Sequence, residues 1–164
     1  MERTVNVELR KVDTENVWDL CRLKVTPEQE NFVAPNLYSI AEAFAARESG
    51  QVALPFGIYE DGAPVGFVML GHGTVGDEDE PDVAAGNYCL WRFMIDARYQ
   101  GRGLGRKALE LVLEYIRTLP CGPAEFCWLS YEPENTGARA LYRSLGFAEN
   151  GETDGDEIVA ILKL

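Results

Sequence analysis

The most constraining feature of this sequence is a glycine-rich segment, residues 100–105, which reads QGRGLG. It follows the run from Asn87 to Ile95, which predicts a long central strand, and it precedes a helical apolar pattern that ends before Pro120. This order places N–H groups that lack intrahelical partners at the positive end of a helix dipole. We therefore expect the turn to bind a phosphate group.

Glycine and local charge both support an anion site at this turn. A side chain there would keep a ligand away from the backbone, so Gly103 and Gly105 are the positions we expect to tolerate replacement least. Between positions 92 and 107 the only acid is Asp96. The basic residues of the same interval are Arg92, Arg98, Arg102, Arg106 and Lys107. The segment lacks the spacing of the P-loop and the ribose-binding acid of dinucleotide folds, so nucleotide hydrolysis and hydride transfer are disfavoured.

The overall composition restricts the choice of partner. The chain has 164 residues and a formal net charge of −12. Such a charge repels nucleic acid and anionic membrane surfaces, and it suits a cationic partner. No long apolar stretch is present, and the N-terminus has no leader-like segment, so we expect a cytoplasmic protein. The four cysteines form no close pair, and we interpret them as small buried hydrophobes.

The rest of the chain predicts a mixed α/β fold in a single domain, residues 1–164. The pattern predicts a strand at Val5 to Leu9 and then two helices, the second with an apolar stripe through Leu37, Ile40 and Phe44. Two strands joined by an Asp-Gly turn follow these helices. The second half predicts βαβ crossover units. Its further elements are a strand over residues 126–131, a helix over 138–145 and a strand over 158–162.

Several motifs together resemble a known family. Gln100-x-x-Gly103-x-Gly105 resembles the acyl-CoA motif of the GNAT superfamily of N-acetyltransferases. Asn135 and the segment 141–147, LYRSLGF, are similar to further parts of that pattern. Residues 29–36, 91–96 and 130–135 resemble bacterial spermine/spermidine (diamine) acetyltransferases. The resemblance implies a mixed sheet with a splayed pair of parallel strands, flanked by helices.

The resemblance also implies acetyl-CoA as co-substrate and no metal. The pantetheine chain would be held by the main chain of Phe93, Met94 and Ile95, and its thioester end by Asn135 and Tyr142. The pyrophosphate would lie on the glycine turn and the start of the next helix. The residues implied there are Gln100, Gly101, Arg102, Gly103, Leu104, Gly105, Arg106 and Lys107.

The same resemblance suggests roles for catalytic residues. Tyr142 would protonate the leaving thiolate, and the N–H of Met94 would stabilise the oxyanion formed during acetyl transfer. The acceptor ammonium must also lose a proton, yet Trp91 stands where one known polyamine acetyltransferase pattern has a glutamate base. Glu132 is our first candidate for that base. Behind it stand Glu28, Glu30, Glu80 and Glu157.

These observations predict an N-acetyltransferase that acts on a small cationic amine, most simply a polyamine. For the acceptor side we select Glu28, Phe32, Asn36 and Glu80 as substrate-binding residues. Two other interpretations stay open. The acceptor is an aminoglycoside, an amino acid or a peptide N-terminus, or the chain is a non-catalytic acyl-CoA sensor. A homodimer is compatible with the resemblance, but no feature of the sequence decides it.

Overall fold

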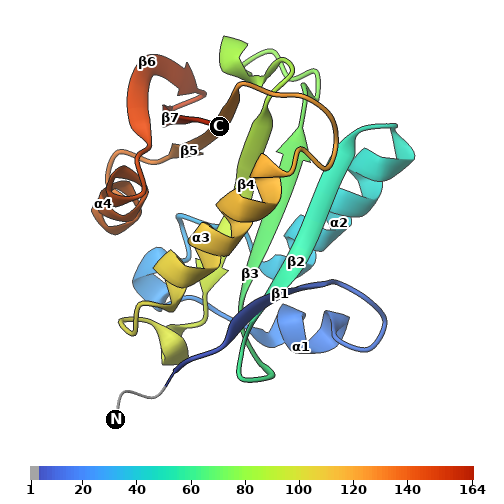
Figure 1. The fold of residues 1–164 in the computed structure, drawn as a ribbon, viewed down its shortest axis with the longest axis vertical. Coiled ribbons are helices and arrows are strands. Elements are labelled where there is room, and N and C mark those ends of the chain that lie inside the picture. The colour runs from blue at the N-terminus through green and yellow to red at the C-terminus, as the bar shows by residue number, and fades with distance from the viewer. Residues whose placement is uncertain (1–3) are drawn as a thin grey trace.

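One seven-stranded sheet organises the chain, of which the computed structural model describes residues 4–164 (Figure 1). The strands are β1 (Val7–Lys11), β2 (Val52–Glu60), β3 (Ala63–His72), β4 (Tyr88–Ile95), β5 (Phe126–Tyr131), β6 (Ala148–Asp154) and β7 (Glu157–Lys163). The helices are α1 (Val17–Arg22), α2 (Asn36–Glu48), α3 (Leu104–Arg117) and α4 (Thr136–Ser144). Short 3₁₀ turns cover Pro27–Gln29, Asp82–Ala84 and Ala97–Tyr99.

The sheet order is β1-β2-β3-β4-β5-β7-β6, and β4 with β5 is its parallel pair. All other neighbours are antiparallel. Asp61 and Gly62, which both have positive φ, make the tight turn between β2 and β3. The mixed α/β fold and the Asp-Gly hairpin predicted from the sequence are therefore confirmed.

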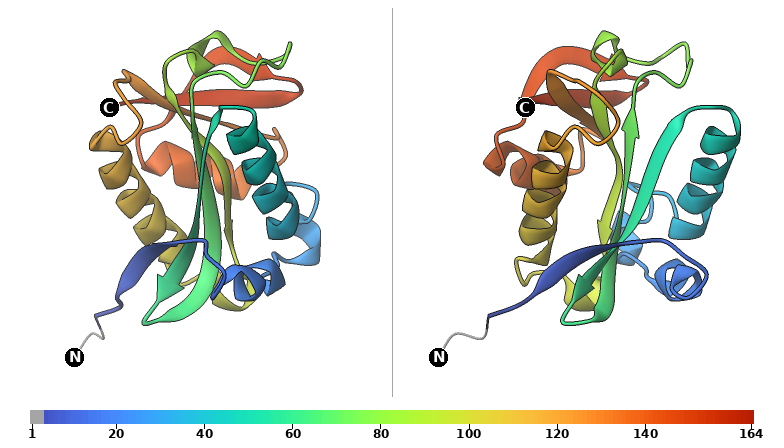
Figure 2. Two further views of the ribbon diagram at one scale, coloured as in Figure 1. Left: turned by 90° about the vertical axis from the view of Figure 1, so that its right-hand side faces the viewer. Right: turned by 45° about the vertical axis from the view of Figure 1, so that its right-hand side comes forward.

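Helices cover both faces of the sheet (Figure 2). Helix α3 packs on one face, where its apolar side meets residues of β2 to β5 such as Tyr88 and Leu129 in the larger core. Helices α1 and α2 lie on the opposite face, where Leu20, Ala43 and Phe67 belong to a second core. The central strands β3 and β4 are thus covered on both sides, which fixes their position in the molecule.

Most of the apolar stripe predicted for α2 lies on the exposed face of that helix, although Ile40 is partly buried against the second core. Leu37 and Phe44 are 57% and 69% exposed. The buried positions are instead Asn36, Ser39, Ala43 and Ala46. Small side chains let the helix backbone approach the sheet closely, so the most buried positions of this helix are small residues and Asn36.

Two other sequence-based interpretations can be compared with the structure. Cys127 is buried, whereas Cys21, Cys89 and Cys121 are partly exposed, so the interpretation as buried hydrophobes holds fully for Cys127 alone. Among residues 4–164, no helix has the length and apolar character needed to span a bilayer.

Candidate active site

The parallel strands β4 and β5 separate shortly after they meet. Tyr88 pairs with Cys127 and Cys89 with Trp128, and no later residue of β4 pairs with β5. Strand β5 instead continues along β7, and the brown-to-red half of the sheet turns away from β4 (Figures 1 and 2). The backbone of β4 after Cys89 is consequently left without a strand partner on this side.

A bulge in β4 lies at the start of this separation. Leu70 of β3 pairs with Leu90 and Met69 pairs with Arg92, so Trp91 is the extra residue. A bulge bends a strand and changes the direction of its side chains. Trp91 and Arg92 both line the cavity that opens here.

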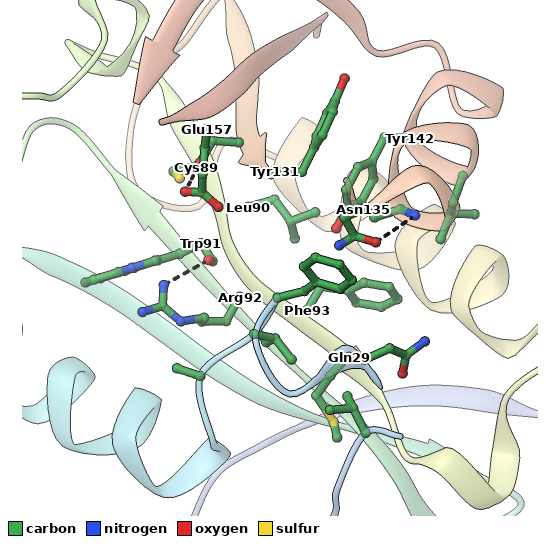
Figure 3. A pocket seen from close by; sticks show the side chains of 18 of the residues that line it. Gln29, Cys89, Leu90, Trp91, Arg92, Phe93, Tyr131, Asn135, Tyr142 and Glu157 are labelled. Carbon is green, nitrogen blue, oxygen red and sulfur yellow. Dashed lines mark hydrogen bonds between the residues drawn. The ribbon is translucent and has the colours of Figure 1, made fainter. Parts of the chain in front are cut away.

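The splayed strands enclose a cavity of about 920 Å³, shown from close by in Figure 3. Its floor is β4, from Cys89 to Ile95, and the glycine turn closes one end. Another wall is formed by Asn135, by Tyr142 of α4 and by Glu157 at the start of β7. The glycine turn, Asn135, Tyr142 and several of the residues that we expected on the acceptor side therefore line one cavity.

The glycine turn has the geometry of an anion site. Gly101 and Gly103 have φ of 75° and 78°, a left-handed conformation that L side chains rarely adopt. Gly103 is the N-cap of α3. No acceptor within residues 4–164 takes a hydrogen bond from the backbone N–H groups of residues 101–106. These free donors at a helix N-terminus fit the pyrophosphate of an acyl-CoA.

Gln100 holds this turn in place by its side chain. Its Nε2 donates to the carbonyl of Ile95 at 2.8 Å and to Oε1 of Gln29 at 2.8 Å. The turn is thereby tied to the end of β4 and to the segment before α2. The side-chain amide of Gln100 is occupied within the protein, although the residue also lines the cavity.

The basic residues near the turn mostly have acidic partners. Arg98 pairs with Asp96, Arg102 with Glu60, and Arg106 with Glu110. Lys107 borders a separate hollow between α3 and the N-terminal strand. None of Arg102, Arg106 and Lys107 lines the main cavity. The backbone of the turn, more than the nearby side-chain charge, therefore provides its anion-binding character.

Tyr142 and Asn135 lie on the wall opposite β4. Tyr142 is 9% exposed, and its pKa is raised by burial first and then by the carboxylate of Glu157. Its hydroxyl makes no hydrogen bond within residues 4–164. The Oδ1 of Asn135 caps α4 by accepting from the N–H of Ala138 at 3.4 Å, which leaves its amide group directed at the cavity (Figure 3).

An acidic group that sequence analysis did not assemble lies beside this wall. The hydroxyl of Ser130 is 3.1 Å from Oε2 of Glu157 and 3.3 Å from Oδ2 of Asp154. All three residues line the cavity. Burial is the first cause that raises the pKa of each carboxyl group. The sequence held no local signal for this group, because its members lie on β5, β6 and β7 and meet only through strand pairing.

The other residues selected from the sequence divide into two sets. Phe32 and Glu80 line the cavity, and Glu80 accepts from the backbone of Val75 at 2.7 Å. Glu28 and Glu132 do not line it. Asn36 is buried away from the cavity, where its Nδ2 donates to the carbonyl of Leu20 at 2.8 Å and so joins α2 to α1.

Residues that sequence reasoning did not select also reach the cavity. Arg92 donates to Glu42 of α2 at 2.8 Å, so a salt bridge spans the cavity wall between β4 and α2. Asp77 lies on the rim in the acidic loop before β4. Within residues 4–164, no three His, Cys, Asp or Glu side chains are grouped as a metal site requires.

Comparison with known proteins agrees with this geometry. Residues 14–147 match the Acetyltransferase (GNAT) family. A spermine/spermidine N(1)-acetyltransferase of Bacillus subtilis (strain 168) is 31% identical over 150 residues, which are 92% of this chain and 93% of the relative. A [ribosomal protein bS18]-alanine N-acetyltransferase of Escherichia coli (strain K12) is 29% identical over 131 residues, 76% of this chain and 79% of the relative.

Solved structures show the same fold. An aminoglycoside acetyltransferase in complex with coenzyme A superposes with a TM-score of 0.76 at 20% identity, over 96% of this chain and 95% of the other. The PaiA N-acetyltransferase of Thermoplasma acidophilum, also with coenzyme A, gives a TM-score of 0.66 at 17% identity, over 97% and 99% of the two chains. The mixed sheet with one splayed parallel pair is thus an architecture known to hold coenzyme A.

Proposed function

Because the chain belongs to the acetyltransferase (GNAT) family and is an acetyl-CoA-dependent N-acetyltransferase, we propose that its acceptor is a polyamine such as spermidine or spermine. The observation that carries this proposal is the charge of the cavity. Arg92 is the one Lys or Arg among the described residues that line it, and it is paired with Glu42. The acidic residues that line it are Glu30, Glu42, Asp77, Glu80, Asp154 and Glu157.

A cavity with this excess of carboxylates favours an acceptor with several positive charges. Each ammonium group loses water on entry, and nearby carboxylates replace that hydration. The B. subtilis relative named for spermine and spermidine supports the same class of acceptor. An acetylated terminal amine loses its charge, so the product binds such a surface less well than the substrate and leaves more readily.

The proposed roles of the protein groups follow from their positions. The main chain of Phe93, Met94 and Ile95 has a free edge on which the pantetheine arm would lie, and the N–H groups of residues 101–106 would bind the pyrophosphate. Acetyl-CoA supplies the activated acetyl thioester. Asn135 would hold the thioester end of the arm through its amide group.

Tyr142 would serve the chemical step by giving a proton to the departing sulfur, since its hydroxyl makes no hydrogen bond within residues 4–164. The oxyanion role expected for the N–H of Met94 does not fit the register of the sheet. Met94 pairs with Phe67, and the N–H of Asp96 two residues later donates to Val65 of β3, so the N–H of Met94 also points to β3 and not to the open edge of β4. On the acceptor side, Phe32 and Glu80 would contact the chain of the polyamine, since both line the cavity.

The test is thiol release from acetyl-CoA by the purified protein with separate acceptors: spermidine, spermine, putrescine, lysine, kanamycin and a short peptide with a free N-terminus. We expect release with spermidine or spermine, and we expect the Tyr142→Phe variant to lose it. Preference for kanamycin or for the peptide would replace the polyamine by that acceptor. Binding of acetyl-CoA without release on any acceptor would favour a sensor over an enzyme.

A further inference from the structure

The cavity needs a proton acceptor that its floor does not provide. A primary amine with a pKa near 10.4 is neutral in roughly one molecule in 2,500 at pH 7, so the attacking nitrogen must be deprotonated in the site. Strand β4, residues 88–95, contains no Asp or Glu, and Trp91 occupies the bulge. Glu132, the first candidate from the sequence, does not line the cavity.

Glu157 is held at the wall of the cavity by two neighbouring strands. It is the first residue of β7, and Asp154 at the end of β6 is its pairing partner. The hydroxyl of Ser130 on β5 is 3.1 Å from Glu157 Oε2 and 3.3 Å from Asp154 Oδ2. A hydroxyl has one proton, so it can donate to only one carboxylate at a time. Glu157 is the nearer of the two acceptors, and when Ser130 donates to it, Oε2 is fixed while Oε1 makes no hydrogen bond within residues 4–164.

The surroundings give this carboxyl group an elevated proton affinity. Burial is the main cause that raises the pKa of Glu157, and the negative charges of Asp154 and Glu132 add to it. The hydrogen bond from Ser130 and the positive charge of Arg92 act in the opposite direction. A carboxylate whose pKa is raised toward neutrality is suited to accept and release protons at working pH.

Glu157 also shares the cavity with the group that would serve as acid. Burial first, and then the negative charge of the Glu157 carboxylate, raises the pKa of Tyr142. Figure 3 shows the two side chains entering the same cavity, one from β7 and one from α4, on either side of Leu90. A reacting centre between them would meet a proton acceptor and a proton donor.

We propose that Glu157 is the catalytic base of the acetyl transfer, with Ser130 and Asp154 as its positioning residues, and this inference rests on the proposed function. Glu157 takes one proton from the acceptor ammonium, and the freed lone pair of nitrogen forms the N–C bond to the thioester carbonyl. When the C–S bond breaks, Tyr142 gives its proton to sulfur and recovers one, through water, from the nitrogen. Glu157 then releases its proton to solvent, so one proton is produced per turnover.

The experiment compares wild type with Glu157→Gln and Ser130→Ala by measuring kcat and KM for spermidine separately as a function of pH. Glu134→Gln is the matched control, since this exposed residue lies outside the cavity. In Glu157→Gln we expect kcat to fall about 10²-fold or more near neutral pH, within the range of general base catalysis. The difference between variant and wild type should then shrink about tenfold for each unit by which pH is raised. The fraction of acceptor that is already neutral in solution rises by that factor, so less deprotonation in the site is needed.

The Ser130→Ala variant gives a readout that a purely structural role would not produce. In wild type the hydrogen bond from Ser130 lowers the pKa of Glu157. Removal of this hydrogen bond should therefore raise that pKa and move the acidic limb of the pH profile to higher pH than in wild type. Thermal unfolding and the stabilisation by acetyl-CoA show that each variant is folded and binds the co-substrate. Glu134→Gln should keep both the rate and the profile of wild type.

The acceptor that the wild-type protein uses distinguishes failure of this inference from failure of the proposed function. If wild type uses another amine of the panel, the polyamine proposal is wrong, and the same variants are measured with that amine. An increase in KM alone in Glu157→Gln, with kcat and the pH profile unchanged, would assign Glu157 to cation binding and overturn the proposal. The same profile change in Glu132→Gln, with Glu157→Gln normal, would return the role to Glu132. A wild type inactive on every amine would overturn both proposals.

Discussion

Replacement of Gly103 or Gly105 by alanine separates the folding role of the glycine turn from its ligand-binding role. At Gly103 the backbone is left-handed, with φ of 78°, and a Cβ would meet no atom within 4 Å. The cost of alanine at this position therefore comes from its backbone conformation. It is about 1 kcal/mol of unfolding free energy, after subtraction of the entropy that alanine removes from the unfolded chain. For a chain of this size we expect Tm to fall by about 2–4 °C.

Gly105 behaves differently because it lies inside α3 with an ordinary helical backbone. A Cβ there would be 3.4 Å from Cζ of Phe93 and 3.7 Å from Cδ2 of Leu141, which is normal contact. Alanine is the better helix former by up to about 1 kcal/mol, so Gly105→Ala should be as stable as wild type or more stable. The added methyl group nevertheless occupies space between Phe93 and Leu141, which both line the cavity.

The assay is thermal unfolding with and without acetyl-CoA. At a concentration 100 times Kd, ligand stabilises wild type by about 2.7 kcal/mol, and a tenfold weaker Kd reduces this to about 1.4 kcal/mol. We expect Gly105→Ala to show at least that reduction without loss of stability in the free protein. A full acetyl-CoA shift in Gly105→Ala would refute the argument that a bare backbone is needed there. An unchanged Tm in free Gly103→Ala would refute the conformational argument.

Three further changes test other parts of the structure. Tyr142→Phe should lower kcat by about 10²-fold while the Kd of acetyl-CoA, measured by calorimetry, stays near wild type. Asn36→Ala should lower the free energy of unfolding in urea by about 1 kcal/mol, because it deletes the hydrogen bond to the carbonyl of Leu20, and an unchanged value would contradict that role. Glu157→Gln should raise Tm at pH 7. The pKa of Glu157 is raised in the folded state, so the charged carboxylate destabilises the fold of wild type, and this cost develops as pH rises from the unfolded-state pKa of about 4.3 to the folded-state pKa. The gain in Tm of the variant should therefore be complete above the folded-state pKa and vanish below about pH 4.3.

The central strand, the glycine turn and the hairpin were predictable because each is a local pattern. Gly103 at the N-cap of α3 and the Asp61-Gly62 turn need backbone conformations that few other residues adopt. The contact face of α2 was not predictable in this way. Apolar periodicity selects the hydrophobic side, whereas this helix turns its small residues, Ala43 and Ala46 among them, to the sheet.

The candidate site likewise has a part that local sequence patterns predict and a part that depends on long-range contacts. The strand edge and glycine turn proposed for the co-substrate lie in one continuous segment, residues 93–105, so their position could be predicted from the sequence. The acceptor side is built from long-range contacts: Arg92 meets Glu42 of α2, and Ser130 meets carboxylates of two later strands. No spacing in the sequence encodes these contacts, since they depend on strand order and register.

The order of the last strands explains how this chain can supply a base when β4 has Trp91 at its bulge. Strand β7 lies between β5 and β6, so the hairpin that joins β6 and β7 returns beside the end of β5. Its first residue, Glu157, therefore stands next to Ser130 at the point where β5 has left β4. The splay that leaves the edge of β4 open, where we propose that the co-substrate binds, is the same feature that brings a carboxylate of β7 to the cavity. Cofactor site and proposed base are thus two consequences of one separation in the sheet.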